Sequence, residues 1–169
     1  DDGGLGGGGR GEQTERGQGG GESSAGSGES EHPAYLRVGL VKSGDAQAVV
    51  SPGNTGASMV ASFFILGLTK GVERPAIATS LPTLTGEAIM LDVGANVDCG
   101  AQHLLQFAIM GHEYGQHLFK KPKPRVGLLS IGEEDSKGNE VTKEAFKLLR
   151  SSPFNFISNV EGRDVYSGN

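Results

Sequence analysis

Blocks of apolar and polar residues follow one another between residues 35 and 158, and each block predicts a helix or a strand. Apolar residues at helical spacing predict helices over 35–42, from 54 or 55 to 66, over 102–119 and over 140–150. Short continuous apolar runs predict strands over 46–50, 75–81, 88–93, 125–131 and 154–158. The two types mostly alternate, which predicts an α/β fold: a Rossmann-like three-layer α/β/α arrangement with a mostly parallel sheet, incomplete within this chain.

The apolar faces of these helices predict how each one packs. The 54–66 helix is apolar nearly all round, so we expect it to be deeply buried or to form an interface. No helix is expected at the end of the chain, over 165–169. The other expected apolar faces are Leu36, Leu40 and Val41; Leu105, Ala108, Ile109 and His112; and Val141, Ala145, Leu148 and Leu149.

Composition separates the first 31 residues from the rest. The first 30 residues hold 13 of the 29 glycines and almost no large apolar side chains, so they cannot bury enough surface to offset the entropy of ordering. We expect residues 1–31 to be a disordered tail or an artefact of cloning or gene prediction, and residues 32–169 to be a partial α/β domain. A G-x-G-x-x-G pattern at Gly4, Gly6 and Gly9 does not indicate a dinucleotide-binding site here, because no strand precedes it.

Charge, cysteine content and hydropathy narrow the class of protein. The net charge is −5, but the first 30 residues hold six acids and two arginines, so residues 31–169 carry only −1. A nearly neutral domain argues against a nucleic-acid-binding protein. A single cysteine, Cys99, excludes an internal disulfide framework. No apolar run is long enough to span a bilayer and no signal peptide is recognisable, so we expect a soluble cytoplasmic protein.

Three polar loops follow predicted strands and precede predicted helices, at 51–56, 92–100 and 130–140. Ligands of α/β proteins bind at such places, so the sequence predicts one site formed by all three loops. In the first loop, Gly53 and Gly56 allow close approach, and Asn54 and Thr55 add side-chain donors. This loop can bind an anion at the helix start, or Asn54 or Thr55 can simply cap the helix.

The second and third loops carry further candidates. Asn96 and Asp98 can orient a substrate, whereas Cys99 is either a nucleophile or, as we prefer, a small half-buried thiol, because no base is identifiable beside it. In the third loop, acids at 133–135 precede Lys137 and Asn139. Either this loop contributes to anion binding, with Lys137 reaching the anion, or it is a solvated run of charges.

Histidines and lysines suggest two more sites. His112 and Glu113 resemble the start of H-E-x-x-H, but His117 falls five residues after His112, not four, so we expect no metal and no cofactor. The one basic cluster is a solvated turn or a docking patch for an acidic partner. It consists of Lys120, Lys121, Lys123 and Arg125.

Six segments together resemble the bacterial acyl-ACP:phosphate acyltransferases of phospholipid synthesis. They are SPGNTGA (51–57), ERPAIATSLPT (73–83), LDVGANVDC (91–99), LLQFAIMG (104–111), PRVGLLSIGEEDSKGNE (124–140) and NVEGRD (159–164). The chain departs from the family pattern at Pro52, where Ala is usual, and at Ser130, where Asn is usual. The helix over 35–42 is shortened, and the family's first glycine loop and its carboxyl-terminal part have no counterpart.

The resemblance implies transfer of a fatty acyl group from acyl carrier protein to inorganic phosphate, giving acyl phosphate for a downstream glycerol 3-phosphate acyltransferase. It also implies a homodimer that associates peripherally with the membrane. We expect Asn54, Asn96, Asp98 and Lys137 to be catalytic. The expected substrate-binding residues are Gly53, Thr55, Gly56, Glu134 and Asn139, and the basic cluster is the expected docking site for acyl carrier protein. The alternatives are a non-catalytic phosphate- or nucleotide-binding module and an inactive truncated product.

Overall fold

The computed structural model describes residues 33–132 and 137–168, so the expected tail and Glu134 lie outside the described residues. Five helices and four strands are described: α1 (Pro33–Ser43), α2 (Thr55–Leu66), β1 (Ala78–Thr83), β2 (Gly86–Leu91), α3 (Ala101–Phe119), β3 (Arg125–Leu129), α4 (Glu140–Arg150), β4 (Asn155–Val160) and α5 (Gly162–Ser167). Helices and strands alternate from α3 onwards, and β3 and β4 are parallel. The α/β class is therefore confirmed.

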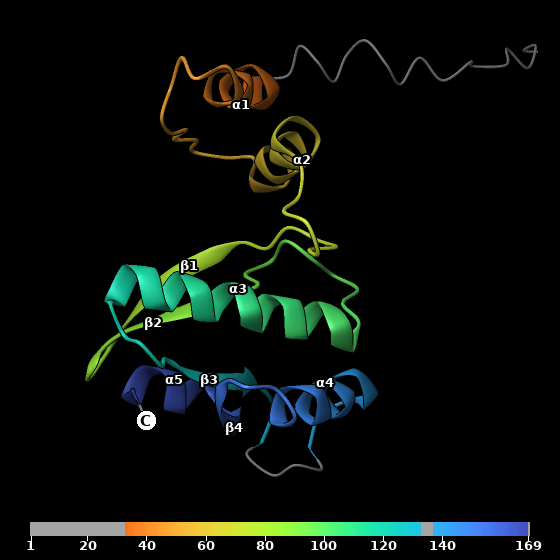
Figure 1. Ribbon diagram of the computed structural model, residues 1–169, viewed down its shortest axis with the longest axis vertical. Coiled ribbons are helices and arrows are strands. Elements are labelled where there is room, and N and C mark those ends of the chain that lie inside the picture. The colour runs from red at the N-terminus through yellow and green to blue at the C-terminus, as the bar shows by residue number, and fades with distance from the viewer. Residues whose placement is uncertain (1–32, 133–136, 169) are drawn as a thin grey trace, which may run out of the picture.

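The longest helix, α3, lies at the centre of the arrangement (Figure 1). It packs on β2 on one side and on α4 and β3 on the other. Two glycines allow this close packing: a Cβ at Gly111 would lie 3.3 Å from the Leu91 side chain, and one at Gly115 would lie 3.5 Å from Pro124. The α1–α2 pair lies at the opposite end of Figure 1 from α4 and α5.

The main core lies between α3, α4 and the β3–β4 pair. Its buried members include Leu128 of β3 and Leu149 of α4, which is only 1% exposed. Phe146 and Phe156 add an edge-to-face aromatic pair, with ring centroids 5.2 Å apart. The apolar face predicted for 140–150 is confirmed in Ala145 and Leu149, because both are buried.

Strands β1 and β2 form an antiparallel hairpin, not part of a parallel sheet. Leu84 and Thr85 alone connect them, and Gly86 takes a φ of +139° at the turn. A parallel connection needs a dozen or more residues, so this short link permits only the antiparallel arrangement. Both strands overlap the predicted ranges, 75–81 and 88–93, but their bounds are shifted by two or three residues.

Two expectations about secondary structure are wrong. Residues 46–50 form no strand; Val50 is 90% exposed, and no described strand pairs with this segment. An apolar run without a neighbouring strand leaves its backbone groups unpaired, so the run alone does not make a strand. The chain also forms a helix near its end, α5, where none was expected.

Helices α1 and α2 pack on each other through Ala34, Val38 and Ala61. The face predicted for α1 is the wrong one, because Leu36 is 62% exposed. Helix α2 is not deeply buried in the described structure: Ala61 is its only buried residue, and Phe64 is 67% exposed. The alternative, that α2 forms an interface, stays a prediction.

We predict that Leu149→Ala destabilises the chain by about 2–5 kcal/mol, because it leaves a cavity among α3, α4 and β3. Urea unfolding followed by circular dichroism measures the change. The matched control, Leu36→Ala, removes the same atoms from an exposed position and should change the free energy of unfolding by no more than about 0.5 kcal/mol. Equal effects of the two substitutions would contradict the assignment of the core.

Candidate functional site

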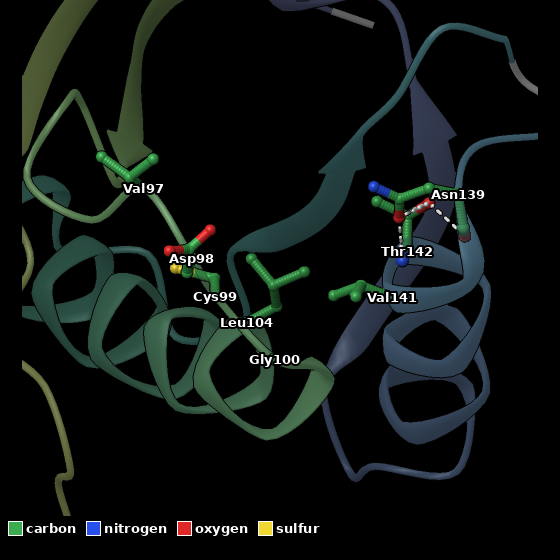
Figure 2. Close-up of a pocket in the computed structure, with 8 residues that line it drawn as sticks. All are labelled: Val97, Asp98, Cys99, Gly100, Leu104, Asn139, Val141 and Thr142. Atoms are coloured by element: carbon green, nitrogen blue, oxygen red, sulfur yellow. Dashed lines mark hydrogen bonds between the residues drawn. The ribbon is translucent and has the colours of Figure 1, made fainter.

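A cleft of about 480 Å³ lies between the loop after β2 and the beginning of α4. Figure 2 shows the two walls facing each other, with side chains of the 97–104 segment on one side and those of 139–142 on the other. The second and third polar loops therefore meet, as the sequence predicts. The lining residues are Val97, Asp98, Cys99, Gly100, Leu104, Asn139, Val141 and Thr142.

The α4 wall is organised by Asn139, the N-cap of the helix. Its Oδ1 accepts hydrogen bonds from the backbone N–H of Thr142 at 2.9 Å and from the Thr142 hydroxyl at 3.2 Å. Because an N–H donor faces Oδ1, the orientation of the amide is fixed. In Figure 2 the amide nitrogen of Asn139 points away from the cap towards the cleft. The same side chain can therefore cap α4 and donate to a ligand.

The opposite wall ends where α3 begins. Gly100 is the N-cap residue of α3, and its N–H donates to Nδ1 of His103 at 3.0 Å. The N-terminal ends of α3 and α4 both border the cleft, since Gly100 and Asn139 line it. Each helix N-terminus carries a partial positive charge, which favours an anionic group, whereas the Asp98 carboxylate that also lines the cleft opposes one.

Asp92 fixes the loop but does not line the cleft. Its carboxylate accepts from the backbone N–H of Ile77 at 2.9 Å and of Asn96 at 2.7 Å. The Asn96 amide nitrogen donates to Asp92 at 3.1 Å and to the Pro75 carbonyl at 2.8 Å. The Asn96 amide nitrogen thus donates to two groups inside the protein, and Asn96 is not among the residues that line the cleft. Its catalytic role stays a prediction, but its observed contacts are structural.

Cys99 lines the cleft as a half-buried thiol. Burial raises the pKa of the Cys99 thiol most, and the negative charge of Asp92 raises it further. Arg74 lowers the pKa by less than Asp92 raises it, and Asp98 adds the smallest increase. A thiol is a nucleophile only as the thiolate. The environment of Cys99 therefore disfavours a nucleophilic role, in line with the preferred reading of the sequence.

The 51–56 loop lies elsewhere in the described structure. Asn54 is the N-cap of α2, and its Oδ1 accepts from the Ala57 N–H at 3.3 Å. None of the described lining residues of the cleft comes from this loop. Asn54 therefore caps α2, whereas its catalytic role stays a prediction. Contacts of Gly53, Thr55 and Gly56 with a substrate stay predictions.

Lys137 is exposed two residues before Asn139, on the segment that leads into α4, and it is not among the lining residues. Gly138 between them takes a φ of +96°, and a Cβ there would collide with the Thr142 hydroxyl. Glycine is thus required at this turn into the cleft wall. A contact between Lys137 and a bound anion stays a prediction.

The basic cluster lies at the other end of α3. Lys120 is the C-cap residue of α3, the Lys121 ammonium lies 5.9 Å from the Phe119 ring centroid, and Arg125 donates to the Gly168 carbonyl at 2.6 Å. The four cationic residues are exposed. Since α3 has 19 residues, about 28 Å of helix separates this cluster from the cleft.

Sequence reasoning missed part of the cleft. Thr142 and the apolar lining residues Val97, Leu104 and Val141 were not singled out as site residues. Thr142 could have been found, because a residue three positions after an N-cap Asn supplies the capped amide. The apolar residues gave no separate signal, since each also fits an ordinary helix or loop.

Within residues 33–132 and 137–168, no three metal-ligating side chains gather closely enough to hold a metal ion. His103, His112 and His117 of α3 therefore form no such group. In the same ranges, none of the helices combines the length and the apolar character that crossing a membrane requires.

Comparisons with known proteins point to one family. A family model described as fatty acid synthesis protein matches residues 29–169. The phosphate acyltransferase of Thermodesulfovibrio yellowstonii is 59% identical over 131 residues, which are 78% of this chain and 38% of that protein. Those of Trichlorobacter lovleyi and Geobacter sulfurreducens are 57% and 56% identical over 129 residues, each covering 76% of this chain and 37% of the relative. The chain thus spans well under half the length of these relatives.

We predict that Asp92→Asn destabilises the chain by about 1–3 kcal/mol, because an amide nitrogen would replace one carboxylate oxygen and face an N–H donor. Thermal unfolding measures the change. Asp45→Asn is the control, since Asp45 is exposed and accepts only from the Ser43 hydroxyl among the described hydrogen bonds. A shift in Tm no larger than that of the control would contradict the role given to Asp92.

We also predict that alkylation of Cys99 by iodoacetamide is shifted to alkaline pH. The pKa of the thiol is raised in the folded chain, so at any pH near neutrality less thiolate is present than in the unfolded chain. The rate is measured against pH for the folded chain and for the chain in urea, where Cys99 is again the only thiol. A folded-state inflection at or below the unfolded one would contradict the prediction.

Proposed function

The chain belongs to the family of fatty acid synthesis proteins, and on that premise we propose that its cleft transfers an acyl group to inorganic phosphate. The acyl donor in this proposal is the thioester of acyl carrier protein, and the products are acyl phosphate and the free carrier thiol. The observation that carries the proposal is the meeting of two helix N-termini and the Asn139 amide at one cleft. The relatives are named phosphate acyltransferase, and this name supports the reaction class.

The proposed reaction needs no nucleophilic side chain. A phosphate oxygen attacks the thioester carbonyl carbon, a C–O bond forms, and the C–S bond breaks as the carrier leaves as a thiolate, which then takes up a proton. The protein must hold the phosphate, align it with the carbonyl carbon and stabilise the oxyanion of the tetrahedral intermediate. A protonated Cys99 in the cleft agrees with direct attack by phosphate.

The described residues suit these tasks in different ways. The Asn139 amide nitrogen and the N-terminal ends of α3 and α4 can hold the phosphate or the oxyanion. The Asp98 carboxylate would repel a fully ionised phosphate, but it can accept a hydrogen bond from a protonated phosphate oxygen and so orient it. Lys137, before α4, adds positive charge to that wall. The apolar side chains of Val97, Leu104 and Val141 suit the first carbons of an acyl chain.

We further propose that acyl carrier protein docks on the basic cluster, where Lys120, Lys121 and Lys123 are exposed. The acyl-bearing arm of the carrier must then span the roughly 28 Å of α3 between the cluster and the cleft. Dimerisation, peripheral membrane contact, a cytoplasmic location and hand-over to a glycerol 3-phosphate acyltransferase complete the proposal. They rest on the family resemblance alone.

We predict that Asn139→Ser lowers phosphate-dependent release of carrier thiol at least tenfold. Serine keeps an N-cap acceptor for α4 but lacks the donor aimed at the cleft, and removing one such donor typically costs about 10²–10³ in kcat. The assay mixes long-chain acyl carrier protein with the chain, with and without phosphate, and measures free thiol. Asn155→Ser is the control, because Asn155 is an exposed residue of β4 away from the cleft.

Two outcomes decide between the candidates, and the second is read from this assay together with thermal melting. Phosphate-dependent release that falls in Asn139→Ser alone supports the proposal. A folded chain that releases no thiol, yet melts at higher temperature with phosphate, is a binding module. Asn54→Ser in the same assay determines whether the 51–56 loop contributes, since serine again preserves the cap of α2.

A further inference from the structure

We infer that Arg74, Glu73 and His103 are positioning residues, which hold the Asp98–Gly100 wall of the cleft in place. The consequence for catalysis rests on the proposed function, whereas the geometric role stands on the contacts alone. Glu73 and Arg74 precede β1, outside the cleft itself. Their contacts with the loop after β2 and with α3 lie 24 to 33 residues further along the chain.

Arg74 holds the loop directly. Its guanidinium Nη1 donates to the backbone carbonyl oxygen of Asp98 at 2.7 Å. A short charge-assisted hydrogen bond is among the stronger kinds in proteins. Since its acceptor is the backbone of Asp98, the bond fixes the path of the chain through the cleft wall and leaves the Asp98 carboxylate available to a ligand.

His103 holds Gly100, two residues after Asp98, and connects it to Glu73. Its Nδ1 accepts from the Gly100 N–H at 3.0 Å, and its Nε2 lies 3.2 Å from a Glu73 carboxylate oxygen. An N–H donor needs a lone pair at Nδ1, so the ring proton is on Nε2 and points to Glu73. The imidazole therefore bridges the start of α3 and the segment before β1 as a neutral group.

Glu73 is itself anchored to α3. Its backbone N–H donates to Oε1 of Gln106 at 2.9 Å, and the Gln106 amide nitrogen donates back to the Glu73 carboxylate at 3.1 Å. The Glu73 side chain is 61% exposed, so its hydrogen bond with His103 alone would contribute little. Together the reciprocal bonds hold the carboxylate beside both His103 and Gln106, one turn apart on α3.

The test uses Cys99, the only thiol of the chain, as a reporter inside the held segment. Iodoacetamide modification of the full chain should be about three- to tenfold faster in Arg74→Ala and in His103→Leu, as expected for loss of one hydrogen bond that keeps the loop closed. Arg37→Ala is the control, since Arg37 is an exposed residue of α1. The direction of the change in rate is informative for Arg74. Loss of its positive charge alone raises the pKa of Cys99 and would slow the reaction, whereas release of the loop speeds it.

Conservative variants separate positioning from general destabilisation. Arg74→Lys keeps a donor for the Asp98 carbonyl, and His103→Gln can accept from the Gly100 N–H as in a capping box. Both should restore rates close to that of the unsubstituted chain. If Arg74→Ala and His103→Leu leave the Cys99 rate unchanged or slower, the inference is wrong.

A second measurement needs no variant. In the ¹⁵N NMR spectrum of the histidine side chains at neutral pH, the unprotonated nitrogen of His103 should be Nδ1 and the protonated one Nε2. A proton on Nδ1 and none on Nε2 would contradict the proposed bridge of His103 between Gly100 and Glu73. If the unsubstituted chain shows no phosphate-dependent thiol release, the proposed function fails, whereas the Cys99 rates and the tautomer still decide the positioning role.

Discussion

The burial of α3 on two sides is the constraint on which the described arrangement depends. Phe107, Ala101 and Gly115 of this helix are buried, and it packs on β2, β3 and α4. Glycine at 111 and 115 lets Leu91 and Pro124 approach the helix backbone closely. Because the start of α3 also forms one wall of the cleft, the packing that stabilises the core places Gly100 opposite Asn139.

The cleft combines structural and chemical tasks in the same side chains. Asn139 satisfies the first turn of α4 with its oxygen, and this hydrogen bond directs its nitrogen to the cleft. At the opposite wall, Arg74 and His103 hold backbone atoms of Asp98 and Gly100 and leave the Asp98 carboxylate available. A ligand therefore meets groups whose orientation is fixed before it binds, which reduces the reorganisation that binding or catalysis requires.

Local sequence patterns predicted the elements that depend on local interactions. The periodicity of α3 and α4 and the cap of α2 at Asn54 were predicted, because their partners lie within four residues. Asn54 and Asn139 have the same local signature, yet only Asn139 lines the cleft, since that difference is set by tertiary position.

The contacts of Glu73 and Arg74 span 24 to 33 residues and left no local pattern. The six residues between the runs at 75–81 and 88–93 were too few for a parallel connection, and that signal was overlooked.

The raised pKa of Cys99 has a consequence for any thioester that enters the cleft. Thiolates exchange readily with thioesters, so an ionised Cys99 would take the acyl group onto the protein and compete with phosphate for it. Burial and the neighbouring carboxylates of Asp92 and Asp98 favour the protonated form of the sulfur. Under the proposed function, the cleft can hold a thiol next to an activated acyl group without becoming acylated itself.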